Sequence, residues 1–487
     1  MINFGLIDEW APSAGHVTTW SASAASTATA SKAPVHPAPP SHQQEEYLRA
    51  ARRNEDAGFR FSRLCLISFD LEGPLDVDAM TRTINEFVGR HDTFLSWFSV
   101  EPDERIARHV VDADVVDFTP TRYGHFGDSG SIRDHVQAKT PGPFHWDCLT
   151  FGTIEREGNF TVYFAVDHLN SDGISQALAC VDLIALYGSH VSGNPHGLQQ
   201  AGSYVDYCRR ERAGTEALTV DDPQVSQWIE LLAQNGGRLP TFPLDLGVDS
   251  EGYTRSALRT VRIMDEESAQ RIEDVCRGLG AGFNSAVLAV AGLAAHEFTG
   301  SDSYFGMTPK STRTSPAEFN AVGWFTNLIP VPVDITDDST FTSVVADTQS
   351  SYERGKALSE VSLHRIVELI PADSPVQVGK GWVVPMVSYI DVRKLPGAQM
   401  FDHINGGVFG NRGSSEEVFL WINRFPEYTV MTLMYPGTVE ADESIGRYVD
   451  KILQIFSSVA ATGDYAPGGE ADTVPASVED RTTLVGS

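Results

Sequence analysis

The chain has 487 residues, of which 41% are hydrophobic and 21% charged, and its formal net charge is −29. This hydrophobic content is typical of a chain that folds around a packed core, and it excludes a largely disordered protein. The strong negative charge argues against nucleic acid and anionic membrane surfaces as main partners, because both are polyanions.

The cysteines and the N-terminus indicate the compartment. The five cysteines are scattered and include no C-x-x-C pair: Cys65, Cys148, Cys180, Cys208 and Cys276. This pattern predicts buried free thiols in a reducing compartment, not a disulfide framework or a zinc site. The first residues lack a basic segment and an apolar core, and no apolar run is long enough to span a membrane. We therefore expect a cytoplasmic protein.

The first part of the chain predicts a mobile arm followed by alternating helices and strands. Residues 21–40 are rich in Ala, Ser, Thr and Pro, which predicts an extended or mobile segment, although composition also allows a segment strapped over the body. The hydrophobic spacing then predicts a helix over 43–55, a strand over 61–71, a helix over 77–90 and a strand over 106–116.

The most informative segment begins with a strand predicted over residues 159–166, which are rich in β-branched and aromatic side chains. His168 ends this strand on the face of its alternate apolar residues. Ser171 and Asp172 occupy N-cap positions of the helix that follows, so a tight turn with Gly173 joins strand to helix. A structural His and an ordinary turn are the commoner explanation of such a pattern taken alone. However, an imidazole beside a helix N-terminus also pairs a general base with an anion-favouring site, as acyl transfer requires.

The second half of the chain repeats this mixture of elements after a polar, Gly-rich linker that begins near residue 189. Helices are predicted over 225–234, 266–279, 284–298 (with an Asn/Ser N-cap) and 445–459. Strands are predicted over 321–335, 383–392, 417–425 and 429–435. The tail over 462–487 is acidic and contains Gly and Pro, which predicts disorder.

No cofactor or metal motif accompanies these elements. The glycines of residues 278–282 lack the third glycine at dinucleotide-binding spacing, and the sequence has no Walker, His-Glu-x-x-His or Gly-x-Ser-x-Gly motif. The fourteen histidines include no pair at metal-ligand spacing on a predicted helix. We therefore expect no metal, no cofactor and no acyl-serine intermediate.

The run from Asp167 to Gly173 resembles the His-His-x-x-x-Asp-Gly motif of the condensation-domain superfamily. Asp167 stands in place of the first His, and His168, Asp172 and Gly173 match the second His, the Asp and the Gly. Further landmarks in the family order are the segments 39–44, 90–98 and 323–327 with Pro330. Within this superfamily the chain is most similar to the mycobacterial polyketide-associated (Pap) acyltransferases, which acylate trehalose or sulfated trehalose. Segments 10–12, 146–148 and 204–208 carry that closer similarity.

The resemblance implies an α/β fold of two chloramphenicol-acetyltransferase-like lobes with an active-site tunnel between them. We place the N-terminal lobe at residues 1–210, including the mobile segment near 21–40, and the C-terminal lobe at 211–461. The resemblance also implies that His168 is the general base and that Asp172 forms a structural ion pair with Arg313 of the second lobe. We expect the Gly173 backbone N–H to face the developing oxyanion, because glycine permits close approach and the helix dipole adds positive charge.

The function implied by the resemblance is O-acyl transfer from a thioester to a hydroxyl of trehalose or a related glycolipid. The thioester, acyl-CoA or an acyl carrier protein, is then a substrate, and a polyketide synthase or a lipid transporter is a further candidate partner. Such an enzyme would work in the cytoplasm or at the inner face of the plasma membrane. A free-standing condensation-type enzyme forming an amide or ester, and a non-catalytic binding module of the same fold, remain alternatives. We expect direct transfer without an acyl-enzyme, since no Ser or Cys lies in a nucleophile motif.

Overall fold

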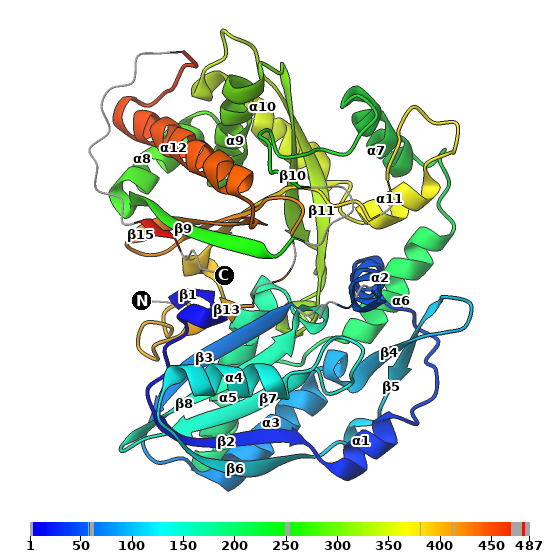
Figure 1. Cartoon of the computed structure of the whole chain (residues 1–487), viewed down its shortest axis with the longest axis vertical. Helices are drawn as coiled ribbons and strands as arrows, with labels where there is room; N and C mark the ends of the chain where they lie inside the picture. Colours follow the sequence, from blue (N-terminus) through cyan, green and yellow to red (C-terminus); the bar gives the residue numbers. More distant parts are fainter. Residues whose placement is uncertain are drawn as a thin grey trace. The chain divides into compact units, whose positions relative to one another are not determined.

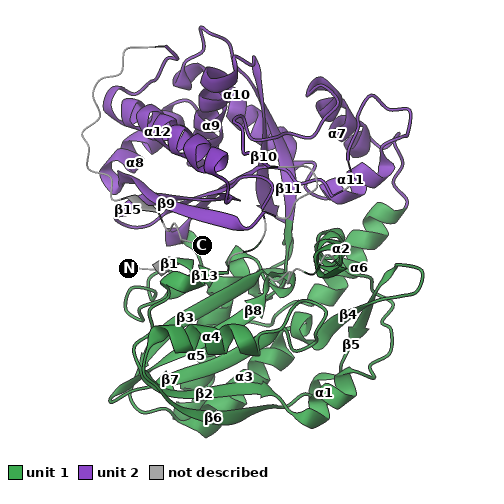
Figure 2. Ribbon diagram, in the orientation of Figure 1, with its two compact units in different colours: residues 1–216, 313–326, 394–413 green, residues 217–312, 327–393, 414–487 purple. Residues whose placement is uncertain are grey.

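The computed structural model describes residues 3–56, 58, 63–248, 254–379, 381–411, 413, 415–468 and 480–482. The chain divides into two compact units (Figure 2). Unit 1 comprises residues 1–216, 313–326 and 394–413, and unit 2 comprises residues 217–312, 327–393 and 414–487. The sequence led us to expect one boundary near residue 210. The chain instead returns to unit 1 twice, because Arg313 of the segment 313–326 pairs with Asp172, in the turn that follows the central strand, and residues 407–410 add a strand to its sheet.

Unit 1 is built on a seven-stranded sheet of order β1-β13-β3-β8-β7-β2-β6. Its strands are β1 (Asn3–Leu6), β2 (Gly15–Ala22), β3 (Leu64–Glu72), β6 (Phe118–Phe126), β7 (Leu149–Glu155), β8 (Asn159–Asp167) and β13 (Gly407–Gly410). A separate hairpin is formed by β4 (Ser96–Val100) and β5 (Ile106–Val110). β8 lies in the middle of the sheet, antiparallel to β3 and β7, and is buried from Phe160 to Asp167. His168, which follows β8, is therefore held at the end of a buried strand that is paired on both sides.

The helices of unit 1 lie on both faces of this sheet (Figure 1). They are α1 (Ala24–Ala30), α2 (His42–Asp56), α3 (Val77–Arg90), α4 (Ser129–Lys139), α5 (Gly173–Ser192) and α6 (Tyr204–Glu216). Ile132 of α4 packs in one cluster with Tyr163 of β8. Phe87 of α3 contacts Phe164, the next residue along β8, with ring centroids 5.6 Å apart. Neighbouring strand residues point to opposite faces, so α3 and α4 cover opposite sides of β8.

The segment over 21–40 is ordered, and our prediction of a mobile arm was wrong. It forms α1, whose N-cap Ser23 accepts a hydrogen bond from the Ser26 backbone. The Trp97 indole donates to the Ala30 carbonyl at 2.9 Å, and the His109 ring donates to the Ala33 carbonyl at 2.8 Å. Small side chains let this backbone lie close to the unit, so the composition that we interpreted as mobility reflects close packing.

α5 is long and apolar enough to cross a membrane by length and composition alone, which the sequence analysis did not anticipate. The pair formed by α8 (Glu266–Gly278) and α9 (Phe283–Thr299), bent by 95°, passes the same test. In unit 1, α5 behaves as a core helix: its buried Asp182 accepts hydrogen bonds from Arg90 at 2.8 Å and pairs with His91 at 3.0 Å. A buried carboxylate needs such partners, so packing explains the composition of this helix.

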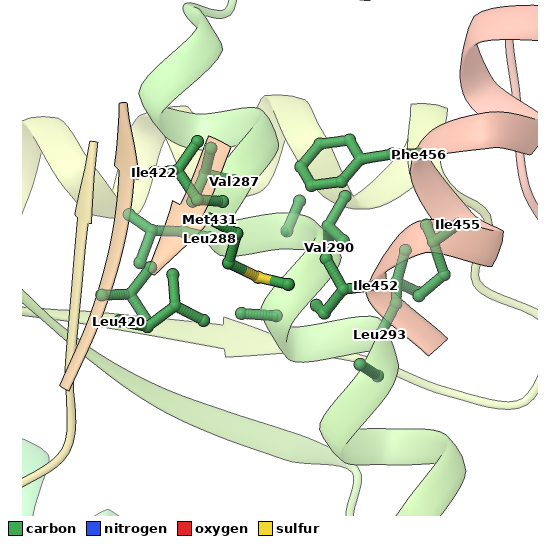
Figure 3. Packing of buried hydrophobic residues seen from close by; sticks show 14 of the residues in the cluster. Val287, Leu288, Val290, Leu293, Leu420, Ile422, Met431, Ile452, Ile455 and Phe456 are labelled. Atoms are coloured by element: carbon green, nitrogen blue, oxygen red, sulfur yellow. The ribbon is translucent and has the colours of Figure 1, made fainter. Parts of the chain in front are cut away.

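Unit 2 has a five-stranded sheet of order β12-β14-β15-β9-β16 and a two-stranded sheet of β10 and β11. The strands are β9 (Ser256–Asp265), β10 (Ser303–Ser311), β11 (Thr326–Asp334), β12 (Met386–Asp391), β14 (Phe419–Arg424), β15 (Tyr428–Pro436) and β16 (Asp480–Thr482). The helices are α7 (Pro223–Gln234), α8 (Glu266–Gly278), α9 (Phe283–Thr299), α10 (Phe341–Lys356), α11 (Leu363–Leu369) and α12 (Val439–Thr462). Figure 3 shows the core, in which Leu288 of α9 and Ile452 of α12 pack with Met431 of β15.

Several predicted boundaries differ from the structure. α9 is capped by Gly282 and has no side-chain cap, α12 begins at Val439, and β11 begins only at Thr326. In the tail, where we expected disorder, β16 pairs with β9. Residues 469–479 and 483–487 of the tail lie outside the described residues, as do residues 61 and 62 of the predicted strand over 61–71.

Candidate active site

The turn after β8 fixes His168 through its backbone. Asp167 ends the strand fully buried, and its carboxylate accepts a hydrogen bond from the Leu169 backbone at 3.0 Å. This contact caps a short 3-10 turn over His168–Asn170. The His168 N–H donates to the Arg63 carbonyl at 2.7 Å, which continues the pairing of β8 with β3 by one residue. Strand pairing on one side and a capped turn on the other leave this backbone little freedom.

The imidazole of His168 lies against an aromatic ring. Its ring centroid is 4.4 Å from that of Trp324. Nδ1 is buried without a hydrogen-bond partner among the described residues. Burial first, and then the guanidinium of Arg63, lower the pKa of His168 to about 4. The ring is therefore neutral near pH 7 and can accept a proton.

Asp172 and Arg313 meet in a bidentate ion pair within unit 1. Arg313 Nη1 donates to Asp172 Oδ2 at 2.7 Å, and Nη2 donates to Oδ1 at 3.2 Å. The Asp172 carboxylate also caps α5, accepting from the Ser175 N–H at 2.8 Å, and accepts from the Phe325 N–H at 3.0 Å. We expected Arg313 in the second lobe, but residues 313–326 belong to unit 1. These four donors hold the Asp172 carboxylate and fix the turn that follows β8.

Ser175 and Gly323 complete this network, and the sequence analysis singled out neither as a site residue. The Ser175 hydroxyl donates to the Gly323 carbonyl at 2.8 Å and accepts from Arg313 at 2.8 Å and from the Gly323 N–H at 3.0 Å. A Cβ on Gly323 would lie 2.4 Å from the buried ring of Tyr204. The Gly-Trp-Phe segment thus needs glycine to bring Trp324 onto His168.

Gly173 begins α5 and is exposed. The amides of a first helical turn have no partner within the helix, so the Gly173 N–H points out of the helix end. Asn327 lies in unit 2, where its side chain donates to the Ser359 carbonyl at 2.9 Å. Trp324 is buried and also contacts Tyr47, with ring centroids 5.5 Å apart.

The other landmarks of the sequence support the His168 turn. The Gln44 side chain, at the start of α2, donates to the Leu169 carbonyl at 3.0 Å. Thr93 donates to the Asn170 side-chain oxygen at 2.9 Å, and Asn170 in turn donates to Cys148 Sγ at 3.3 Å. These segments therefore hold the turn in place from two further parts of unit 1.

The cysteines are buried, free and poor nucleophiles. Burial raises the pKa of Cys148 well above its usual value and that of Cys180 to about 12. A thiol with so high a pKa supplies almost no thiolate at neutral pH. Among the described residues, no group of three or more His, Cys, Asp or Glu side chains could hold a metal ion.

The comparisons with known proteins now define the class. The family described as the Condensation domain matches residues 64–378, which is more than half of the chain and includes the His168 turn. The chain belongs to the condensation-domain family. A condensation domain of the polyketide synthase MokA shares the fold, with a TM-score of 0.67 at 16% identity over 87% of this chain and 97% of that one.

Closer relatives are acyltransferases of the Pap group. The chain is 35% identical over 467 residues to the 2'-acyl-2-O-sulfo-trehalose (hydroxy)phthioceranyltransferase PapA1 of Mycobacterium tuberculosis, covering 95% of this chain and 89% of PapA1. It is 34% identical to the acyltransferase PapA3 of the same species, covering 95% and 98%. The solved structure of the PapA2 acyl transferase matches with a TM-score of 0.88 at 32% identity, covering 94% of this chain and all of that one. These relatives confirm the predicted family and fold, and the chain is an acyltransferase.

Proposed function

We propose that the chain transfers a fatty or polyketide acyl group from a thioester to a hydroxyl of trehalose or a related glycolipid. The names of two relatives support this acceptor: PapA1 acts on a sulfated acyl-trehalose, and PapA2 is named a trehalose-2-sulfate acyltransferase. The donor is acyl-CoA or an acyl carrier protein, and the reaction takes place in the cytoplasm or at its membrane face. The neutral imidazole of His168, which follows β8 and packs on Trp324, is the observation that carries the proposal.

In this mechanism His168 is the general base. A sugar hydroxyl is a weak nucleophile at neutral pH, and a neutral imidazole nitrogen can take its proton as the oxygen attacks the thioester carbonyl. We assign this role to Nε2, because Nδ1 is buried, and the Trp324 ring packs beside the imidazole and limits its orientation. The same nitrogen then returns the proton to the departing thiolate, so His168 ends the cycle neutral.

The oxygen of the tetrahedral intermediate needs stabilisation of its negative charge. The Gly173 N–H at the N-terminus of α5 supplies a donor and the positive end of a helix dipole. Asp172 and Arg313 contribute indirectly, because they hold the first turn of α5 against the segment that carries Trp324.

Transfer is direct, through a complex that holds both donor and acceptor. Support comes from the cysteines nearest the site: the pKa of the Cys148 thiol is raised far above neutrality, and its sulfur accepts a hydrogen bond from Asn170. Neither feature suits a nucleophile that must carry an acyl group.

The experiment is to incubate the protein with palmitoyl-CoA and trehalose and to search for an ester by mass spectrometry. An acylated trehalose and an equivalent amount of free coenzyme A support the proposal. An acylated amine, formed when amino acids compete with trehalose, would favour a condensation-type enzyme. Donor binding without any product would favour a binding module.

A further inference from the structure

The backbone carbonyl that follows His168 in its turn is held by a side chain from α2. Gln44 Nε2 donates to the Leu169 carbonyl at 3.0 Å, and Gln44 is fully buried. The Leu169 N–H donates to the Asp167 carboxylate at 3.0 Å. Both polar groups of the Leu169 backbone are therefore fixed by side chains, and Gln44 supplies one of these two contacts.

A buried arginine determines which end of the Gln44 amide faces that carbonyl. Arg108 lies on β5, is 1% exposed, and donates from Nη2 to Gln44 Oε1 at 2.9 Å. A guanidinium has donors only, whereas an amide has a donor end and an acceptor end. Exchanging the two ends of the amide would place its NH2 against the guanidinium and its oxygen against the Leu169 carbonyl. Arg108 therefore directs the donor end of Gln44 at the His168 turn.

The other contacts of Arg108 are also with neutral groups. Nη1 donates to the Ser96 hydroxyl at 3.1 Å, Nη2 also donates to the Pro39 carbonyl at 3.3 Å, and no carboxylate of the described residues forms an ion pair with Arg108. The guanidinium carbon lies 4.9 Å from the ring centroid of Phe98, which is opposite Arg108 in the β4–β5 hairpin. A buried cation is costly unless it is well bonded. The bond to Gln44 is the shortest of the three, and it is charge-assisted.

We propose that Arg108 is a positioning residue for acyl transfer, which acts on His168 through Gln44 and the Leu169 carbonyl. Without Arg108 the Gln44 amide is free to rotate, the Leu169 carbonyl loses its donor in part of the molecules, and the turn that holds the imidazole loosens. This inference rests on the proposed function, because it assigns to Arg108 an effect on the step in which His168 takes the hydroxyl proton.

The test measures the single-turnover rate of ester formation from palmitoyl-CoA and trehalose, which isolates the chemical step. We expect Arg108→Met to lower this rate by about tenfold, the loss that corresponds to one charge-assisted hydrogen bond, and to leave KM for both substrates within about twofold. Arg108→Lys keeps a charged donor beside Gln44 and should recover part of the rate. Circular dichroism checks that each variant is folded.

Arg133→Met is the matched control. Arg133 of α4 also donates to a backbone carbonyl and a serine hydroxyl, those of Trp10 and Ser129, but it has no bond to Gln44. This variant should keep the wild-type rate. Equal rates for Arg108→Met and Arg133→Met would overturn the inference.

Gln44→Glu separates the proposed role from the packing of α2. A glutamate keeps an acceptor for Arg108 and adds an ion pair, so the variant should remain folded, but an ionised carboxylate has no donor for the Leu169 carbonyl. We expect the single-turnover rate to fall by about tenfold or more. A wild-type rate in folded Gln44→Glu would contradict the inference, and this variant decides the question if Arg108→Met does not fold.

Two further measurements show whether Arg108 acts through Gln44 on the turn. In a double-mutant cycle of Arg108→Met and Gln44→Met, the double variant should be no slower than the slower single variant, and multiplied losses would overturn the inference. Hydrogen exchange of the segment 168–172, followed by mass spectrometry, should be faster in Arg108→Met than in the wild type and unchanged in Arg133→Met. Equal exchange in Arg108→Met and the wild type would also overturn it. Exchange needs no substrate, so it shows whether Arg108 holds the turn even if no acylated trehalose forms and the proposed function fails.

Discussion

At the scale of single residues, the proposed reaction depends on a histidine that is neutral before it accepts a proton. Burial and Arg63 lower the pKa of His168 to about 4, whereas an unperturbed imidazole titrates near 6.5. The depressed pKa keeps the ring in its proton-accepting form throughout the neutral range.

This shift predicts the pH profile of kcat/KM for a neutral acceptor. The rate should stay flat as the pH falls from 7 through about 5 and decline only as the pH approaches about 4, where His168 becomes protonated and can no longer accept a proton. Circular dichroism at each pH separates this loss from unfolding. An acid limb at or above pH 6.5 would show that the base is not held neutral in the way the structure indicates.

The cysteines give a second prediction at this scale. Incubation with palmitoyl-CoA alone should leave the intact mass of the protein unchanged, because burial raises the pKa of Cys148 and Cys180 far above neutrality. The measurement is intact-protein mass spectrometry before and after adding trehalose. A stable acyl adduct that disappears when trehalose is added would replace direct transfer with an acyl-enzyme route.

At the scale of elements, the site is an assembly of three segments. The end of β8 supplies His168, the start of α5 supplies Asp172 and Gly173, and the segment over 313–326 supplies Arg313 and Trp324. The ion pair and Ser175 join the second segment to the third, and Trp324 joins the third to the first.

The ion pair predicts strong coupling between Asp172 and Arg313. Each single change to Ala should cost roughly 3 kcal/mol of unfolding free energy, because it leaves a buried charge without its partner. The double variant should cost clearly less than the sum of the two, as measured by denaturant unfolding in a double-mutant cycle. Additive losses would mean that the two side chains do not stabilise each other.

Replacing Gly323 with a larger residue should displace the ring that packs on His168. In Gly323→Ala the new Cβ would lie 2.4 Å from the Tyr204 ring, so the segment must shift and carry Trp324 away from His168. We expect a loss of about 1–3 kcal/mol in stability and a fall in kcat. Gly188→Ala on α5 is the control, because a Cβ there meets no atom within 4 Å. Equal activity of the two variants would show that the close approach of Tyr204 does not position Trp324.

Sequence alone predicted elements whose pattern is local. The helix over 77–90 matches α3 at both ends, and the predicted turn of His168, Asp172 and Gly173 lies where β8 passes into α5. The resemblance also named Arg313 as the partner of Asp172, and the structure brings the two together. The helix prediction depended on the spacing of apolar residues, and the turn and the ion pair depended on the motif from Asp167 to Gly173.

Features that depend on distant contacts could not be predicted in this way. β6 is mostly exposed apart from its first residue, so it lacks an apolar alternation, and it was missed. The arm over 21–40 is fixed by Trp97 and His109, which no local pattern reveals. Ser175 and Gly323 become recognisable only when residues 148 positions apart in the chain meet, as they do in the Ser175–Gly323 hydrogen bonds.

At the scale of the whole molecule, the reaction proposed for this acyltransferase depends on one base, His168, directly after the middle strand of the sheet of unit 1. The fold and the family are shared with the Pap acyltransferases along almost the entire chain. The proposed chemistry requires the side chain of His168, which can be changed in the intact protein.

The most direct test is the rate of ester formation from palmitoyl-CoA and trehalose by folded His168→Ala. We predict a fall in turnover of about a hundredfold or more. His125→Ala serves as the matched control, because His125 is exposed on β6 and contacts only His16 among the ring contacts of the described residues; it should retain wild-type turnover. Near-normal turnover in folded His168→Ala would contradict the central claim.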